Sequence, residues 1–164
     1  MQFEGGVTYT GRGARIDGRH AFGTGAWALS IGAGLDGTFA GGSATTKLPG
    51  VDIGSLRGFG FDVPVLAGWR STSSLYQIWF GARGGWERYF ISPVTTAPTT
   101  VPPSLEADRV RIGGVAGLAT GFGHVHVGLE IEIGYQLVTG TLGKVSASVD
   151  GVAFTPASAV WWDF

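Results

Sequence analysis

Hydrophobic and polar residues alternate along most of the chain. The clearest case is the stretch 124–135, HVHVGLEIEIGY, in which every odd position is apolar and the even positions hold two histidines, two glutamates and two glycines. A period of two is typical of a β-strand with one apolar and one ionisable face. In a soluble barrel the apolar face would turn inward, whereas in a membrane barrel it faces lipid and the polar residues line the interior.

The same alternation predicts an all-β fold, with residues 1–164 forming a single eight-stranded antiparallel up-and-down barrel. We find no apolar stripe with helical periodicity long enough for a helix. Asp36-Gly37 is a strong two-residue hairpin signal, so it predicts the turn between the second and third strands. Pro64 lacks a backbone donor and predicts a bulge within the fourth strand. The expected strands are about Gln2–Thr10, His20–Leu35, Thr38–Lys47, Ser55–Trp69, Leu75–Tyr89, Ala107–Phe122, His124–Tyr135 and Val152–Phe164.

The expected connections alternate in length. Links after the second, fourth and sixth strands are short, at Asp36-Gly37, 70–74 and Gly123, and the others are longer. One long link, 92–107, is rich in proline and threonine and cannot form a packed core. Transmembrane barrels have long extracellular loops and short periplasmic turns. An even number of strands would return both termini to the periplasmic end.

Composition favours the membrane alternative. Charged residues make up 14% of the chain, against about 25% in a soluble domain, so something other than water is expected to cover much of the surface. A net charge of −1 gives no basic face for nucleic acid. No cysteine is available for disulfides or thiolate metal sites. The thirty glycines lie inside the alternating segments, where they permit the bends and close packing of a barrel wall.

Membrane insertion by a helix and export by a visible leader are both unsupported. No run of 18 or more apolar residues is present, which excludes a helical membrane span. The start, MQFEGG, has neither the basic nor the apolar region of a secretory signal. If the protein is exported, Met1 is expected to replace a removed leader.

The chain stops on an aromatic residue in the sequence VWWDF, where Val160, Trp162 and Phe164 share one face. This pattern resembles the C-terminal assembly signal of bacterial outer-membrane β-barrels, and the size and strand number are similar to the small OmpX and OmpA transmembrane-domain type. Pro156 and Ser158 depart from the apolar outward pattern of that family. The resemblance implies a monomer in the outer membrane, with outer-membrane lipid or lipopolysaccharide and the barrel assembly machinery as partners.

An outward apolar face would place the ionisable residues in the lumen. Buried charges are costly unless they are paired, so we expect them to form a crosslinked network. Eight strands leave an interior just wide enough for side chains to fill, which predicts a polar, plugged lumen. The expected network consists of Arg83, Arg109, Arg111, Glu130, Glu132, Asp62 and Glu87, and Glu4 shares its parity.

These features predict a non-catalytic outer-membrane anchor that presents extracellular loops for surface interaction and needs no cofactor. One alternative is a narrow solute or ion pore. Another is a soluble lipocalin-like carrier of small molecules, in which Trp27, Phe61, Phe80 and Ile131 would line an inner cavity. A carrier would be expected to have more lysine and glutamate on its exposed face.

A lipid A-modifying outer-membrane enzyme is the remaining alternative. Such barrels use a histidine with a serine and an acid on the lipid-facing side of the outer leaflet. Here His124 and His126 would face inward near the periplasmic end, which is the wrong face and leaflet, so no enzyme is expected. His-x-His is also a metal-ligand spacing, with Glu130 as a possible third ligand. Two histidines on a strand are more often hydrogen-bonded lumen residues, and no metal is expected.

Overall fold

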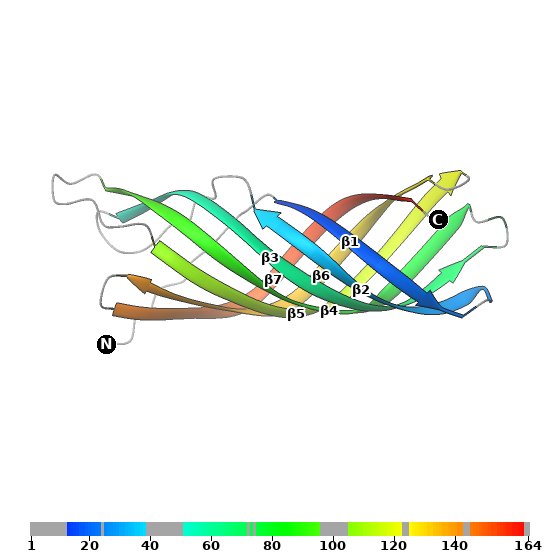
Figure 1. Cartoon of the computed structure of the whole chain (residues 1–164), viewed down its shortest axis with the longest axis horizontal. Helices are drawn as coiled ribbons and strands as arrows, with labels where there is room; N and C mark the ends of the chain where they lie inside the picture. The colour runs from blue at the N-terminus through cyan, green and yellow to red at the C-terminus, as the bar shows by residue number, and fades with distance from the viewer. Residues whose placement is uncertain are drawn as a thin grey trace.

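The protein forms one antiparallel, up-and-down sheet of seven strands in the computed structural model, which describes residues 13–23, 25–38, 51–71, 73, 75–95, 105–122, 125–142 and 145–162 (Figure 1). The all-β expectation is confirmed for these residues. Among them, no helix is long and apolar enough to cross a membrane. The strands are β1 (Gly13–Phe22), β2 (Trp27–Thr38), β3 (Val51–Arg70), β4 (Tyr76–Thr95), β5 (Leu105–Phe122), β6 (Val125–Leu142) and β7 (Val145–Trp162).

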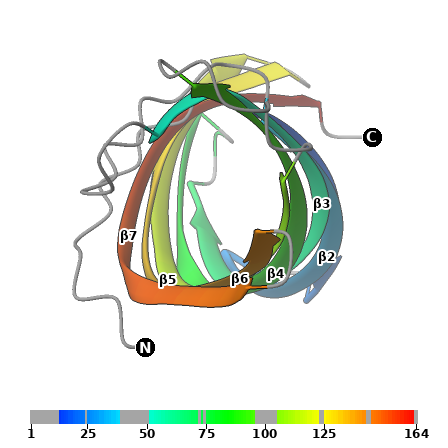
Figure 2. The ribbon, with the colours of Figure 1, turned by 90° about the vertical axis from the view of Figure 1, so that its left-hand side faces the viewer.

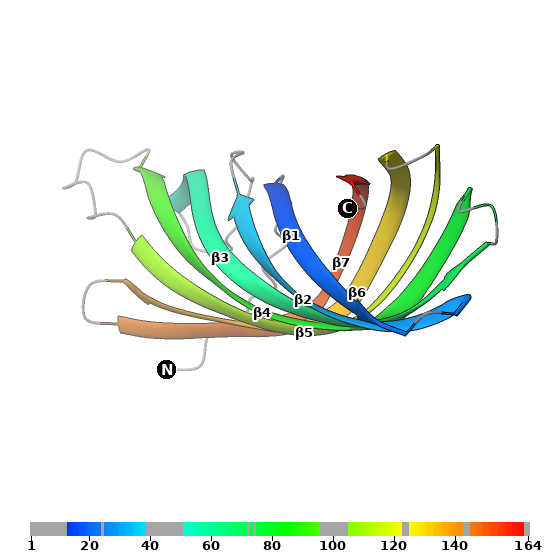
Figure 3. The ribbon, with the colours of Figure 1, turned by 45° about the vertical axis from the view of Figure 1, so that its right-hand side comes forward.

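The sheet curls strongly about an axis along its length, as the end-on view shows (Figure 2) and a turned side view confirms (Figure 3). Each strand pairs with its sequence neighbour. The curl is tight enough for side chains of distant strands to meet, since Arg15 Nη1 of β1 lies 3.1 Å from Glu130 Oε1 of β6. The concave side is called the inner face below, and the convex side the outer face.

Alternation along the strands sorts the side chains between these two faces. On β6, the apolar side chains of Leu129, Ile131 and Ile133 are 45–60% exposed, whereas Glu130 and Glu132 are each 5% exposed. β3 and β4 show the same arrangement of exposed apolar and buried charged side chains, because Phe61 and Phe80 are exposed whereas Arg83 is only 1% exposed. The described sheet therefore has an apolar outer face and a charged inner face.

Glycines make room for the large inner side chains. In the register of the sheet, Gly85 lies beside both Asp62 and Arg111, and Gly117 lies between Trp79 and Glu130. A side chain at Gly85 would come within 3.2 Å of Arg111 Nε. A narrow interior can therefore hold bulky charged groups because their neighbours along the ladder lack side chains.

The pair Gly117 and Trp79 provides a stability test. A methyl group at Gly117 would overlap the Trp79 indole, and the indole nitrogen donates a 2.9 Å hydrogen bond to Glu130 that limits its movement. We expect Gly117→Ala to lower the free energy of unfolding by about 1–3 kcal/mol. Gly114→Ala is the matched control on the same strand, because its added methyl would be 3.9 Å from the nearest atom. Denaturant titration of the two variants in detergent checks this, and equal stabilities would contradict it.

The predicted turn at Asp36-Gly37 is wrong. Both residues lie inside β2, opposite Arg15 and Ala14 of β1. Arg15 Nε donates a 2.8 Å hydrogen bond to the Asp36 carboxylate, so a tertiary ion pair outweighs the local turn preference. The chain also reverses within the expected second strand, between β1 and β2, beginning at Gly23, whose φ of 126° suits glycine. The expected strand His20–Leu35 is therefore the end of one strand and most of the next.

The predicted bulge at Pro64 is also wrong. Pro64 keeps its place opposite Arg83, and the register shift in this ladder lies at Ile53/Ser55 instead. On the β2 side the pairing skips from Ile31–Val65 to Gly34–Asp62 without a change of register. The missing donor of proline therefore interrupts the ladder without displacing it.

Several links also differ from expectation. The long link expected before the last strand is wrong, because only residues 143 and 144 separate β6 from β7. The long link expected at 92–107 is shorter, since β4 continues to Thr95 and β5 begins at Leu105. The expected first strand, Gln2–Thr10, lies outside the described residues, as does most of the expected third, Thr38–Lys47.

Candidate functional site: an inner charge network and an outer apolar belt

Arg83 is the centre of the inner charge network. Its side chain is fully buried, with Nε 3.4 Å from Asp62 Oδ1 and Nη1 3.3 Å from Glu132 Oε2. Nη1 also donates to Glu130, and Nη2 lies 3.4 Å from Asp17 Oδ2. One guanidinium on β4 thus joins carboxylates from β1, β3 and β6, which resists opening of the curled sheet.

Two further arginines share Asp62 and Glu132 with Arg83 and add Asp36 to the network. Arg111 Nη1 lies 3.1 Å from Glu132 Oε1, and its Nη2 lies 2.6 Å from Asp36 Oδ2. Arg15 Nε lies 2.8 Å from Asp36 and 3.0 Å from Asp62. Each carboxylate therefore contacts more than one arginine, as buried charges require.

Arg19 extends this network toward the end of the sheet where β7 finishes. Its Nη2 lies 3.0 Å from Asp17 and 3.3 Å from Glu130, and its guanidinium carbon lies 5.8 Å from the centre of the Trp79 ring. The arginine side chain is 30% exposed, which makes it the most accessible member of the central cluster. The central cluster comprises Arg15, Arg19, Arg83, Arg111, Asp17, Asp36, Asp62, Glu130 and Glu132.

A second inner cluster lies toward the opposite end. Arg109 Nη2 donates a 2.5 Å hydrogen bond to Glu87, which also accepts bonds from Tyr89 and Thr38. Arg109 Nη1 donates to Gln136 at 3.3 Å, and its guanidinium carbon lies 5.4 Å from the Tyr89 ring centre. This rim cluster comprises Arg109, Glu87, Tyr89, Thr38 and Gln136. The donors to Glu87 are Arg109, Tyr89 and Thr38, none of which belongs to the central cluster.

The seven residues predicted for the network divide between these clusters. Asp62, Arg83, Arg111, Glu130 and Glu132 meet in the central cluster, whereas Glu87 and Arg109 form the rim cluster.

Sequence reasoning missed Arg15, Asp17, Arg19 and Asp36. The first three lie at alternate positions of ARIDGR, a period-two signal between the first and second expected strands, and this segment is part of β1. Asp36 lies in the expected turn. Trp79 shares the parity of Gln77 and Arg83, but only the tertiary structure shows that its indole nitrogen donates a hydrogen bond to Glu130.

The outer face carries a broad apolar belt with a sharp polar border. In register across β4 to β7, Arg88, Asp108, Thr139 and Ser148 form one polar row. The outward positions of β5 beyond this row are apolar or glycine from 110 to 118, and Thr120 follows. That nine-residue stretch matches the roughly 9–11 residues with which a tilted strand crosses a membrane.

Aromatic side chains flank the belt at both borders. Near the polar row, Phe59 stacks on Phe90 with ring centres 6.0 Å apart and meets Trp86 edge-on at 6.4 Å. At the other border Trp27 pairs with Trp69 in the β2–β3 register. Aromatic girdles on either side of an apolar band are typical of barrels in lipid.

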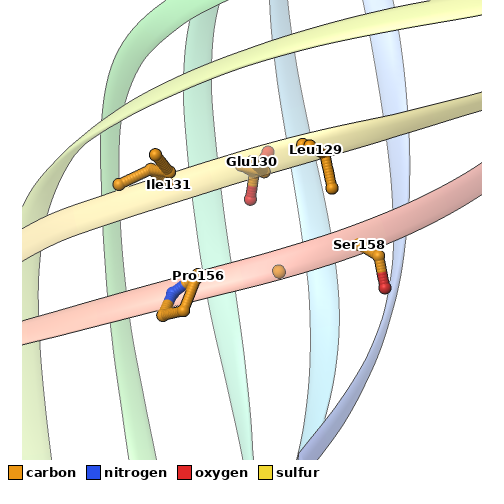
Figure 4. A pocket seen from close by; sticks show the side chains of 6 residues that line it. Leu129, Glu130, Ile131, Pro156 and Ser158 are labelled. Atoms are coloured by element: carbon orange, nitrogen blue, oxygen red, sulfur yellow. The ribbon is translucent and has the colours of Figure 1, made fainter.

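A shallow groove of about 330 Å³ lies on the outer side of β6 and β7 (Figure 4). It is lined by Leu129, Ile131, Pro156 and Ser158, with Glu130 and Ala157 between them. The Glu130 side chain is 6% exposed and is held by Arg83 on the inner face. The exposed lining of the groove therefore combines apolar surface with one hydroxyl group and no histidine.

The residues considered for metal binding are only partly described. His126 is completely buried on the inner face, where Gln77 Nε2 lies 3.3 Å from its Nδ1. His124 lies outside the described residues. Within the described ranges, no group of three or more histidine, cysteine, aspartate or glutamate side chains could hold a metal ion.

The three residues of the C-terminal pattern are only partly described. Val160 lies on the outer face and is 72% exposed, in keeping with its expected parity. Trp162 ends β7, and Phe164 lies outside the described residues.

Comparison with known proteins finds no significant match to any family model, curated protein or solved structure. Function is therefore inferred from the two faces of the sheet.

Proposed function

We propose that the chain is an eight-stranded up-and-down β-barrel that spans the bacterial outer membrane as a non-catalytic anchor. In this proposal it presents the connections from β2 to β3 and from β4 to β5 at the cell surface, at the end of the sheet where β2 and β4 finish. The observation that carries the proposal is the inversion of polarity: an apolar belt of membrane-spanning length covers the outer face, while ion-paired arginines fill the inner face.

The inversion is costly in water and favourable in lipid. Exposed apolar patches on soluble monomers rarely exceed a few hundred Å². Here Trp27, Phe61, Phe80 and Ile131, the residues that a soluble carrier would place in its cavity, are 45–56% exposed on the outer face. Hydrocarbon around the belt would remove this penalty, because lipid tails are themselves apolar.

The inner network favours an anchor over a pore. Arg83, Asp62 and Glu87 are almost completely buried and tie different strands together, as expected of a lumen plugged by paired charges. Outer-membrane lipid and the barrel assembly machinery are the partners we propose, with Val160, Trp162 and Phe164 as the assembly signal.

Extraction behaviour tests the membrane assignment. We expect the folded chain to stay in the membrane fraction after salt and alkaline washes and to leave it only in detergent. The folded and heat-denatured forms should migrate differently on a gel, because a hydrogen-bonded barrel resists unfolding by dodecyl sulfate at room temperature. A folded, monodisperse protein in buffer without detergent would overturn the proposal and favour a soluble carrier.

A further inference from the structure

Asp62 is the carboxylate of the central cluster with the poorest hydrogen bonding. Its side chain is completely buried, and neither carboxylate oxygen has a hydrogen-bond partner among the described residues. The nearest arginine nitrogens lie 3.0, 3.4 and 3.6 Å away, on Arg15, Arg83 and Arg111. These cations attract a negative charge, but none of them donates a hydrogen bond to Asp62. An ionised Asp62 would therefore have lost its hydration without gaining hydrogen bonds in return, which is costly.

Two of these arginines donate to Asp36 instead. Arg15 Nε carries a single hydrogen and donates it to Asp36 at 2.8 Å, although Asp62 Oδ2 lies only 3.0 Å from the same nitrogen. Arg111 Nη2 donates to Asp36 at 2.6 Å and lies 3.6 Å from Asp62 Oδ2. The two carboxyl groups thus share both nitrogens, and the hydrogen bonds favour Asp36.

The β2–β3 ladder holds these two carboxyl groups together. Asp36 pairs with Gly60, and Asp62 pairs with Gly34, so the aspartates are diagonal neighbours on the inner face with glycines opposite them. Two ionised carboxylates at such close range repel each other. The central cluster also has five carboxyl groups and only four guanidinium groups among the described residues. One carboxyl group therefore has no matching cation there.

We propose that Asp62 is a proton-binding site. At about pH 5.5, where an exposed aspartate is ionised, the Asp62 carboxyl group keeps its proton and donates a hydrogen bond from Oδ2 to the Asp36 carboxylate. Oδ1 then faces Arg83 Nε, which donates to no other group in the described structure. The proton comes from solvent as the chain folds. This inference goes beyond the membrane anchor proposed above and does not depend on lipid, because neighbouring side chains of the sheet bury Asp62.

Infrared spectroscopy of the folded full-length chain tests the protonation. A protonated carboxyl group has a carbonyl stretching band separate from the bands of carboxylates. At about pH 5.5 we expect Asp62→Asn to remove one such band. Glu87→Gln is the matched control and should leave the band in place, because Glu87 is 2% exposed but accepts hydrogen bonds from Arg109, Tyr89 and Thr38. An unchanged spectrum in Asp62→Asn would overturn the proposal.

The stabilities of the same two variants give a second readout. Asparagine has the shape and neutrality of a protonated aspartate, so Asp62→Asn should change the equilibrium constant of unfolding by less than about tenfold at the same pH. Glu87→Gln leaves Arg109 without its charged partner and should raise that constant by about a hundredfold. Reversible urea titrations measure both. An Asp62→Asn variant that is as unstable as Glu87→Gln, or that does not fold, would show that Asp62 is an ionised partner of the arginines.

The pH dependence of stability gives an independent check. If Asp62 is protonated, the folded state binds one proton more than the unfolded chain, whose aspartates ionise above about pH 4. The free energy of unfolding then falls as pH rises, until Asp62 loses its proton in the folded state as well. Over this range the unfolding constant of the parent should rise about tenfold per pH unit relative to Asp62→Asn. The comparison cancels the other ionisable groups of the inner face, which are the rest of the central cluster, Glu87, Arg109 and His126. Parallel pH profiles would contradict the proposal.

Discussion

Arg83→Met should strongly destabilise the protein, because the fully buried Arg83 side chain stands at the centre of the inner charge network. The variant removes the cation that joins Asp62, Glu130 and Glu132, and it leaves these carboxylates buried with fewer partners. Breaking a buried ion pair from one side typically costs about 3–5 kcal/mol. Arg15 and Arg111 still contact the same carboxylates, so we expect a loss near the lower value.

Arg88→Met on the same strand is the matched control. Arg88 also pairs with two carboxylates, at 3.2 Å from Glu106 and 3.6 Å from Asp108, but its side chain is 41% exposed on the outer face. Exposed pairs contribute about 0–1 kcal/mol. Urea titrations of both variants, refolded into lipid vesicles, measure the difference, and adding Glu130→Gln to Arg83→Met should restore part of the loss. If both arginines cost the same, the inner network does not stabilise the fold as we infer.

Ile131→Arg should cost about 2–4 kcal/mol in lipid vesicles under the proposed membrane location, because a charge near the middle of the apolar belt would then have to leave water. Ile131 stands in the row of Phe80 and Ala116, well inside the polar border, and it is 45% exposed on the outer face. The penalty should arise from solvation and not from packing, since the side chain projects away from the sheet.

Thr139→Arg controls for the effect of an arginine on β6. Thr139 shares the outer face but stands in the polar row opposite Asp108 and Ser148. Its free-energy cost should stay near 0–1 kcal/mol, as for lipid-facing charges at the membrane interface. Reversible unfolding in vesicles compares the pair. An Ile131→Arg variant as stable as the parent would mean that water, not lipid, surrounds the belt.

The face of each side chain could be predicted from alternation within single strands. Glu130 and Glu132 share a parity opposite to Ile131, and any β-strand sends them to the other side of the sheet. The all-β class follows from the same local pattern. Seven of the inner charges were identified in this way because parity is a property of the backbone and needs no knowledge of partners.

Strand ends were less predictable where a side chain had a distant partner. Asp36-Gly37 has the local chemistry of a turn, yet Asp36 remains in β2 because Arg15 and Arg111 hold its carboxylate. Pro64 has the local chemistry of a bulge, but the neighbouring pairs keep their register on either side. In both cases, contacts between strands outweighed the local preference of a short segment for a turn or a bulge.

By itself, the sequence determined which residues face inward and which face outward, because the two-residue period of a strand is set by local backbone geometry. Only the tertiary structure decided that Arg83, Asp62 and Glu130 meet in one cluster while Glu87 and Arg109 form another. That grouping depends on how far the sheet curls and on the register between neighbouring strands. Both result from pairing and packing among residues far apart in the chain.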